Sequence, residues 1–337
     1  MAYVSSATVS LSSSILYVEN LKVWHPVKKL FSIIGYVRAV DGVTLDVKPR
    51  EVLSIVGESG CGKTTLARAI LGLVPITSGK VIFEGIDITE KLRKPTYAFR
   101  KQYSSKIGYV QQDPYSAVPP FMNIKNILEE PLRIHKIPKR ERLTRILNVL
   151  SEVGLTPPEE FLHKYPHMIS GGQLQRVAIA RSLILEPKIV IADEPVSMLD
   201  ASIRIDVLTL FNKLREKHDL SIIYITHDLA TAKYFSNRIA IMYAGQIVEV
   251  GKARDVIYKP KHPYTESLLE AIPDPDPQNR FVFRKVLPGE PPNLINPPTG
   301  CRLSPRCPHA VSICKEKEPP YIKLSNDRYV KCWLYSR

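Results

Sequence analysis

The most constraining feature of the sequence is a glycine-rich segment, Gly57–Thr65, between an apolar run and a helical pattern. Its residues, GESGCGKTT, fit the pattern GxxxxGK[ST]. The apolar run Val52–Val56 predicts a buried strand before it, and Lys63–Gly72 has a helical period that ends at a glycine. Strand, glycine-rich loop and helix in this order are typical of a phosphate-binding site. The chain must therefore contain an α/β unit.

The residue types of this loop suit phosphate chemistry. Glycine lets the backbone turn so that successive N–H groups face an anion at the positive end of a helix. Lys63 can reach the β- and γ-phosphates of a nucleotide, and the hydroxyl of Thr64 can bind Mg²⁺. The predicted nucleotide-binding residues are Gly57, Glu58, Ser59, Gly60, Cys61, Gly62, Lys63, Thr64 and Thr65.

Two acidic residues, Asp193 and Glu194, follow the apolar run Ile189–Ala192. In phosphate-loop NTPases an acid at such a strand exit holds Mg²⁺, and a neighbouring acid can orient or deprotonate the attacking water. We therefore predict Asp193 as the Mg²⁺ partner and Glu194 as a catalytic residue. His227 follows another apolar run, Ile222–Ile225, and can hydrogen-bond the γ-phosphate. Solvated acids and a structural histidine are the alternatives when each motif stands alone.

The rest of the chain divides by composition. Short apolar or alternating runs from Ile15 to Val56 predict strands, with a basic insert around Pro26–Lys29. The stretch Asn123–Leu185 carries helical patterns and no strong strand pattern, which predicts a helical insertion. Strand, helix, strand then recurs across 189–225, as in a doubly wound parallel sheet. After Gly251 the chain becomes proline-rich and loop-like, with no sheet core of its own.

Composition limits the class of protein. The 337 residues are 44% hydrophobic and 24% charged, as in a globular chain. No run approaches the roughly 18 apolar residues of a membrane-spanning helix, and the first residues lack a secretion-signal pattern, so we expect a cytoplasmic protein. The net charge of +14 is compatible with nucleic acid, an anionic membrane surface or phosphorylated ligands.

A short motif identifies the family that the chain resembles. Ile169 precedes Ser170, Gly171, Gly172 and Gln173, and this segment resembles the signature LSGGQ of ATP-binding subunits of ABC transporters. The resemblance covers nearly the whole chain after residues 1–14. It implies head-to-tail pairing of two cassettes, in which Ser170 and Gly172 of one contact the γ-phosphate of ATP bound by the other. Ser170 can also N-cap a helix that begins near Gly171.

The resemblance implies further residues at the ATP site. Gln112, in preference to Gln111, corresponds to the glutamine loop, and Asp200 to the aspartate loop. His227 corresponds to the switch histidine. Gln112 and His227 are expected to be catalytic residues beside Glu194, and Gln112 also to contact Mg²⁺.

The sequence does not single out one residue that contacts adenine. The family places an aromatic ring there, and by position that residue is His25, with Trp24 and Tyr36 as the other candidates. Packing of Trp24 in the sheet is the structural alternative.

The implied fold is an α/β, ABC-type P-loop NTPase with a RecA-like core, an antiparallel β subdomain and a helical subdomain, followed by a Pro/Cys-rich C-terminal extension. We expect a flexible tail over 1–14, a nucleotide-binding domain over 15–252 and an extension over 253–337. The helical subdomain is expected at about 113–185.

Four of the five cysteines lie in the last 37 residues: Cys301, Cys307, Cys314 and Cys332. In a reducing compartment such crowding favours metal over disulfides. The segment that begins at His262, HPYTESLLEAIPDPDP, resembles the extension of oligopeptide/dipeptide-importer ATPases and their nickel-importer relatives. That resemblance favours a [4Fe–4S] cluster over Zn²⁺, with free thiols as a third option. We expect a structural role for the centre.

These observations predict an ATP-hydrolysing importer subunit at the cytoplasmic face of the membrane, bound peripherally. Short peptides are the expected cargo, with a sugar or nickel as alternatives. The chain most resembles the second, F-type cassette, which favours a heterodimer with a homologous ATPase over a homodimer. The family also implies two permease subunits and an extracellular solute-binding protein. The permease is expected to dock near Tyr115, Val118 and Phe121, and ordinary loop packing of these residues is the alternative.

The alternative function is a soluble ABC ATPase that acts on nucleic acid or ribosomes. The net charge favours it, but the single copy of each motif and the absence of sustained heptads count against it, so no nucleic-acid partner is expected. A third possibility, an iron–sulphur redox enzyme, is not supported, because no substrate or flavin motif accompanies the cysteines.

Overall fold

The computed structural model describes residues 14–29, 32–272, 287–325 and 327–336. Its described residues form two compact units. Unit 1 draws on Met1–Val47, Leu53–Arg93 and Thr226–Arg337, and unit 2 on Lys48–Val52 and Lys94–Ile225. All but one residue of the predicted tail 1–14, and prolines 273, 275 and 277, lie outside the described residues.

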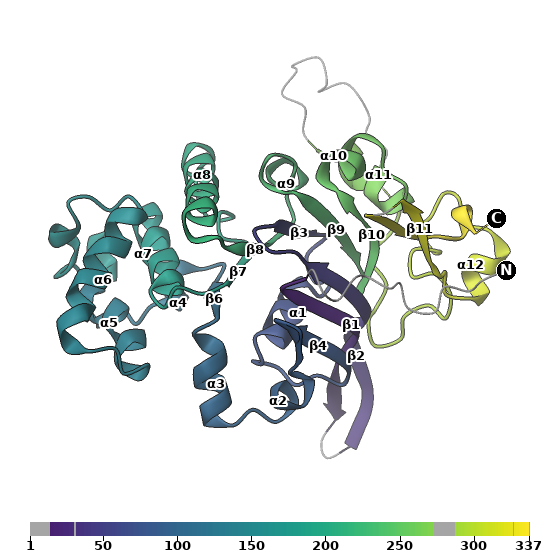
Figure 1. Cartoon of the computed structure of the whole chain (residues 1–337). Helices are drawn as coiled ribbons and strands as arrows, with labels where there is room; N and C mark the ends of the chain where they lie inside the picture. The colour runs from purple at the N-terminus through teal and green to yellow at the C-terminus, as the bar shows by residue number, and fades with distance from the viewer. Residues whose placement is uncertain (1–13, 30–31, 273–286, 326, 337) are drawn as a thin grey trace. The chain divides into compact units, whose positions relative to one another are not determined.

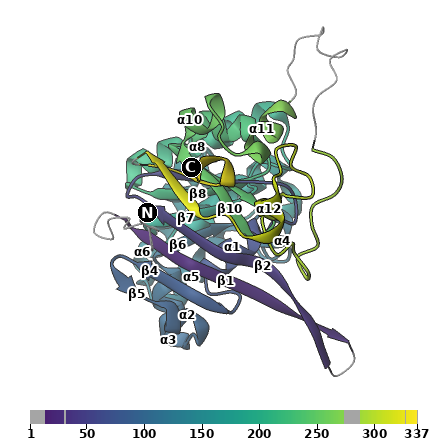
Figure 2. The same cartoon turned by 90° about the vertical axis from the view of Figure 1, so that its right-hand side faces the viewer.

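Unit 1 contains an antiparallel sheet in the order β2-β1-β4-β5. The strands are β1 (Leu16–Lys29), β2 (Ser32–Val47), β4 (Ser78–Phe83) and β5 (Ile86–Asp87). The prediction of a basic insert at Pro26–Lys29 was wrong, because these residues continue β1 and pair with β2. Pairing across the hairpin satisfies the backbone while Lys28 and Lys29 stay exposed. Figure 2 shows this hairpin extending past β4.

A second set of strands in unit 1 positions the phosphate loop. β3 (Val52–Val56) lies parallel to β9 (Arg238–Tyr243), and β9 is antiparallel to β10 (Gln246–Lys252). Two C-terminal strands extend this sheet beyond β10, as Figure 1 shows in yellow: β12 (Arg328–Lys331) pairs with β10, and β11 (Tyr321–Ser325) pairs with β12. In the described part of the proline-rich extension, these two strands enlarge an existing sheet.

The helices of unit 1 are short. They are α1 (Lys63–Ile70), α2 (Thr89–Arg93), α9 (Leu229–Phe235), α10 (Ala253–Tyr258), α11 (Pro263–Glu270) and α12 (Ser312–Glu316). One buried cluster joins the sheet to the extension: Tyr243 of β9 and Tyr264 of α11 belong to it together with Leu303, and Cys301 and Cys307 pack against it. The extension thus shares an apolar core with the strands that carry the phosphate loop.

Unit 2 is a three-stranded parallel sheet with helices. β6 (Ile107–Val110), β7 (Ile189–Asp193) and β8 (Ser221–Thr226) pair in that order, and every residue of β7 and β8 is buried. The helices are α3 (Tyr97–Ser104), α4 (Pro114–Ala117), α5 (Ile124–Ile134), α6 (Lys139–Glu152), α7 (Gly171–Leu183) and α8 (Ala201–His218). The predicted helical region and the buried parallel strands are both confirmed.

Within the part of the chain that the structure describes, no helix has both the length and the apolar character needed to cross a bilayer.

Candidate functional site

The phosphate loop of unit 1 has a backbone shape that glycine alone tolerates at two positions. A Cβ atom on Gly57 would lie 2.1 Å from the carbonyl oxygen of Met242. One on Gly62 would lie 2.0 Å from the carbonyl oxygen of Ala39, and Gly62 has φ +108°. These close approaches seat the loop against neighbouring backbone, so that α1 begins directly at Lys63.

Lys63 is buried, with 5% of its surface exposed. Its ammonium group donates to the carbonyl oxygens of Gly57 at 2.7 Å and Glu58 at 2.9 Å. Ser59 and Gly60 form the exposed tip of the loop, while Thr64 and Thr65 are partly buried. A preformed loop with a buried cation beside a helix N-terminus is suited to binding phosphate groups.

In unit 2, two acids lie at the end of β7. Asp193, 3% exposed, accepts a hydrogen bond from the hydroxyl of Tyr109 at 3.3 Å. Glu194 follows with φ +47°, and its N–H donates to the carbonyl oxygen of Ile225 at 2.9 Å. Its carboxylate accepts from the side-chain amide of Gln112 at 3.1 Å. The structure therefore brings Glu194 and Gln112 together.

The signature residues of unit 2 form a helix cap. Ser170 is the N-cap of α7, and its hydroxyl accepts from the N–H of Gln173 at 3.3 Å. The side chain of Gln173 accepts from the N–H of Ser170 at 3.1 Å, which completes a capping box. The predicted N-cap role of Ser170 is confirmed. Gly171 and Gly172 open the helix, and Asp200 is the exposed N-cap position of α8.

His227 is exposed directly after β8, in unit 1. It precedes Asp228, whose carboxylate caps α9 by accepting from the N–H of Ala230 at 2.8 Å.

The adenine candidates differ in their contacts. The indole N–H of Trp24 donates to Asp41 at 3.2 Å, and the guanidinium of Arg38 lies 4.9 Å from the Trp24 ring. The ring of Tyr36 lies 6.4 Å from that of Trp24. Trp24 is therefore engaged in packing and polar contacts. Its strand neighbour His25 is partly buried.

Of the three residues considered for permease docking, Val118 is buried and belongs to the packing of its unit. Tyr115 and Phe121 are 56% and 93% exposed.

The four clustered cysteines line one cavity of about 220 Å³ in unit 1, together with His262 and His309. One water molecule occupies about 30 Å³ in the liquid, so the cavity is larger than a single ion requires. The side-chain atoms as they stand in the described ranges form no group of three or more His, Cys, Asp or Glu ready to hold one metal ion.

Burial favours the protonated form of three of the thiols on this cavity. Burial raises the pKa of Cys301 to about 11 and also raises the pKa of Cys307 and of Cys332. A bound metal ion would favour the thiolates and release these protons. The donor set, four soft sulphur atoms on one cavity, suits a thiolate-bound metal centre.

Three contacting residues were missed at the sequence level. Tyr109, on β6, bonds Asp193, and no local pattern marks it. Arg302 and Arg306, buried at 6% and 8% exposed, bond residues of the nucleotide-binding region. The sequence feature that could have pointed to these two arginines is their position between two candidate metal ligands, in the run CRLSPRC.

Together, the phosphate loop, the acids after β7 and the capped signature helix define a nucleotide-binding cassette. Residues 40–197 match the model of the ABC transporter family, and residues 248–314 match the oligopeptide/dipeptide transporter C-terminal region.

The relatives agree. The chain is 40% identical to the oligopeptide transport ATP-binding protein AppF of Bacillus subtilis, over 98% of this chain and all of that protein. It is 44% identical to the oligopeptide transport ATP-binding protein OppF of Salmonella typhimurium, over 88% and 86% of the two chains. A solved ATP-binding cassette, dimeric and bound to ADP and Pi after hydrolysis, matches 71% of this chain and 99% of its own at 30% identity, with a TM-score of 0.62. The chain therefore belongs to the family of ABC transporter ATPases of the oligopeptide/dipeptide type.

Proposed function

We propose that the chain hydrolyses ATP to drive the import of di- or oligopeptides through a membrane transporter. The observation that carries the proposal is the phosphate loop, in which the buried Lys63 ammonium is held by the carbonyl oxygens of Gly57 and Glu58. The peptide cargo is supported by the printed names of the relatives, which are peptide-transport proteins. Neither they nor the matching family models favour the nucleic-acid alternative.

In this proposal the loop residues bind the phosphates of ATP, with Thr64, Gln112 and Asp193 as the Mg²⁺ contacts. Glu194 orients the attacking water and accepts its proton as the bond to the γ-phosphate breaks. The hydrogen bond from Gln112 supports this role because it fixes the direction of the Glu194 carboxylate. His227 hydrogen-bonds the γ-phosphate, and Trp24 or His25 contacts adenine.

The proposal includes a second cassette. Ser170, Gly171, Gly172, Gln173 and Asp200 would contact the γ-phosphate bound by a homologous partner, with a heterodimer favoured over a homodimer. The dimeric solved cassette supports such pairing. Loss of the γ-phosphate would remove a contact made only in the closed pair, which gives the cycle its two states. Two permease subunits and an external solute-binding protein would complete a transporter, with this chain on the cytoplasmic face of the membrane.

The test replaces Glu194 with Gln, which keeps the hydrogen bond to Gln112 possible but removes the base. The variant should hydrolyse ATP at least about 100-fold more slowly and should accumulate as an ATP-bound dimer with its partner subunit, measured by size-exclusion chromatography. Glu216→Gln, an exposed acid on α8, is the matched control and should behave like the wild type. Unchanged ATP turnover in Glu194→Gln would contradict the assigned chemistry.

We further propose that Cys301, Cys307, Cys314 and Cys332 hold a [4Fe–4S] cluster in preference to Zn²⁺. The common cavity of about 220 Å³ supports a multi-atom centre. Four thiolates around one zinc ion would stand only about 3.8 Å apart, given a Zn–S distance of about 2.3 Å. When bound, the centre would cross-link three segments of the extension, which is a structural role.

Absorbance near 400 nm, with iron and sulphide analysis of anaerobically purified protein, tests the cluster. Iron and inorganic sulphide in equal amounts are expected, and both should fall together in Cys314→Ser. Zinc without sulphide would contradict the cluster. The absence of both iron and zinc would contradict a metal centre of either kind.

A further inference from the structure

The loop Cys301–Cys307 has two faces. Cys301, Leu303, Ser304 and Cys307 line the cysteine cavity. The arginines that alternate with them, Arg302 and Arg306, are buried and bond residues of the nucleotide-binding region of unit 1. The same seven residues therefore touch both the cavity and the elements around the phosphate loop.

Arg306 contacts the phosphate loop directly. Its guanidinium lies 3.5 Å from the carboxylate of Glu58, the second residue of that loop, and 3.4 Å from the hydroxyl of Tyr243. It also donates to the carbonyl oxygen of Pro288 at 3.0 Å, within the extension. With 8% of its side chain exposed, the arginine is held from both sides.

Glu58 is consequently held at three points. Its N–H donates to the hydroxyl of Tyr264 at 3.0 Å, and its carbonyl oxygen accepts from Lys63 at 2.9 Å. Its carboxylate faces Arg306. Because the carbonyl oxygen of the same residue binds Lys63, a shift of Glu58 changes the position of the cation that would bind the β- and γ-phosphates.

Arg302 is connected to the loop indirectly, through the turn after β9. It donates to the carbonyl oxygen of Ala244, and the next N–H, that of Gly245, donates to the carbonyl oxygen of Cys61 at 2.8 Å. Cys61 belongs to the phosphate loop. A Cβ on Gly245, at φ +85°, would lie 3.0 Å from Arg302, so the turn fits closely around the guanidinium.

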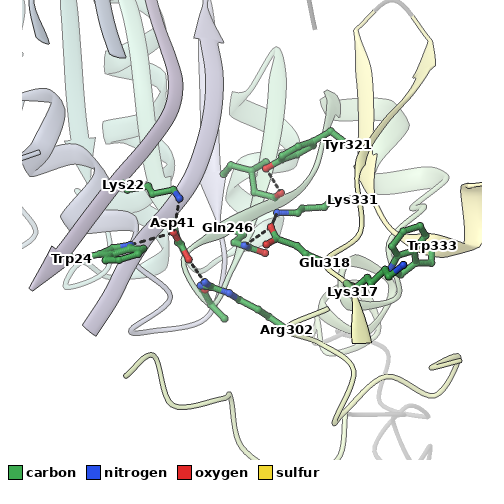
Figure 3. Close-up of polar contacts among 12 residues, drawn as sticks. Lys22, Trp24, Asp41, Gln246, Arg302, Lys317, Glu318, Tyr321, Lys331 and Trp333 are labelled. Carbon is green, nitrogen blue, oxygen red and sulfur yellow. Dashed lines mark hydrogen bonds and ion pairs between the residues drawn. The ribbon is translucent and has the colours of Figure 1, made fainter. Parts of the chain in front are cut away.

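Arg302 also bonds Asp41, the acid that accepts the indole N–H of Trp24 (Figure 3). The Arg302 and Asp41 side chains are 6% and 11% exposed, so their ion pair is shielded from water. The figure shows Arg302 directed at Asp41, with Trp24 and Lys22 approaching the same carboxylate from β1.

We propose that the Cys301–Cys307 loop positions the phosphate loop for ATP, with Arg306 acting through Glu58 and Arg302 acting through the Ala244–Gly245 turn and Asp41. Both arginines are positioning residues, since neither is assigned a contact with the nucleotide. The proposal rests on the assignment of Gly57–Thr65 as the ATP-binding loop. It follows that a change in the cysteine cavity alters ATP affinity, and by linkage that ATP alters the stability of the cavity.

The test measures the Kd of a fluorescent, non-hydrolysable ATP analogue with Mg²⁺, and the kcat and KM of ATP hydrolysis, on the full chain. Arg306→Ala should weaken binding about fivefold or more and raise KM, while kcat at saturating ATP stays within about twofold. Arg306→Lys, which keeps a charge near Glu58, should recover part of the affinity. Arg254→Ala, an exposed arginine on α10, is the matched control and should bind like the wild type.

A double-mutant cycle identifies the route. In a Glu58→Gln background, Arg306→Ala should lose most of its effect, because its partner is already neutral. For the second arginine, Arg302→Lys is preferred to Arg302→Ala, because the alanine would leave the Asp41 carboxylate with the more distant Lys22, at 4.0 Å, in place of its buried partner. Arg302→Lys should weaken binding of the ATP analogue, as Arg306→Ala does. Thermal unfolding should show that each variant remains folded.

The outcomes separate the inference from the function on which it rests. If Lys63→Ala abolishes binding but Arg306→Ala binds like the wild type, the positioning role is wrong. A full Arg306→Ala effect in the Glu58→Gln background also overturns it. If Lys63→Ala binds the analogue like the wild type, the ATP-site assignment itself fails.

Discussion

The phosphate loop and the cysteine-lined extension are built in different ways. The loop is one continuous segment, and its shape comes from close backbone approaches at Gly57 and Gly62. The extension gathers Cys301, Cys314 and Cys332 from separate segments around one cavity, and buried ion pairs bind it to the strands. A site made from adjacent residues can be recognised from sequence, whereas a site made from distant side chains requires the fold.

The largest effect should come from the ion pair that fastens the extension to β10. Glu249, fully buried, accepts from Arg328 of β12 at 2.7 Å and from the N–H groups of Lys261 and His262. Arg328→Met leaves this carboxylate without its charged partner. The free energy of unfolding, measured by urea titration, should fall by about 3–5 kcal/mol.

The matched control for this change is Lys323→Met. Lys323 lies exposed on the neighbouring strand β11, so its replacement should alter the unfolding free energy by no more than about 0.5 kcal/mol. Equal losses in the two variants would show that the buried pair has no special part in holding the extension.

The second prediction compares two glycines of the phosphate loop. In Gly62→Ala the new Cβ meets the carbonyl oxygen of Ala39 at 2.0 Å, whereas in Gly60→Ala it meets nothing within 4 Å. Both have positive φ, so Gly60→Ala should cost about 1–2 kcal/mol of unfolding free energy through backbone strain alone. Gly62→Ala should cost at least about 1 kcal/mol more and abolish ATP binding. Equal costs and retained binding in both would indicate a loop that rearranges freely.

Much of unit 2 and of the loop was predictable for simple physical reasons. Buried parallel strands are continuous apolar runs, so Ile189–Ala192 and Ile222–Ile225 predicted β7 and β8 within one residue at each end. The glycine pattern predicted the strand, loop and helix around Lys63, and the cap at Ser170 followed from its side chain.

Other features depended on tertiary contacts that no local pattern carries. Pro26–Lys29 has a turn-like, basic composition, but pairing with β2 makes it a strand. The hairpin of β11 and β12 is stabilised by its place against β10, and the proline content of the extension concealed it. The ion pairs of Arg302 with Asp41 and of Arg306 with Glu58 join residues more than 200 positions apart.

The third prediction concerns acid stability. Burial lowers the pKa of His262, on the cysteine cavity, from the ordinary 6.5 to about 3. Between these values the unfolded chain binds a proton that the folded chain does not. The unfolding free energy should therefore fall as pH drops from 6.5 toward 3, by up to about 1.4 kcal/mol per pH unit, with no contribution from His262 above that range.

His262→Asn is the variant that isolates this contribution. The Nδ1 atom of His262 accepts from the N–H of Tyr264 at 3.2 Å at the start of α11, and an asparagine oxygen can accept the same bond. The pH slope of the variant should be smaller than that of the wild type by up to the stated amount, measured by urea unfolding across pH 4–6.5. Identical slopes would mean that His262 binds its proton at the same pH in the folded protein as in the unfolded chain.

The smallest effect should come from the fifth cysteine. Cys61 lies in the phosphate loop with 5% exposure, and burial raises the pKa of its thiol, so the reactive thiolate is scarce at neutral pH. Cys61→Ala removes one buried atom, which should cost about 1 kcal/mol of unfolding free energy and leave the KM for ATP within about twofold. Cys314→Ala, equally a buried thiol, should cost more because it also removes a ligand of the proposed centre. If Cys61→Ala instead impaired ATP hydrolysis while Cys314→Ala were neutral, sulphur chemistry would belong to the phosphate loop and not to the extension.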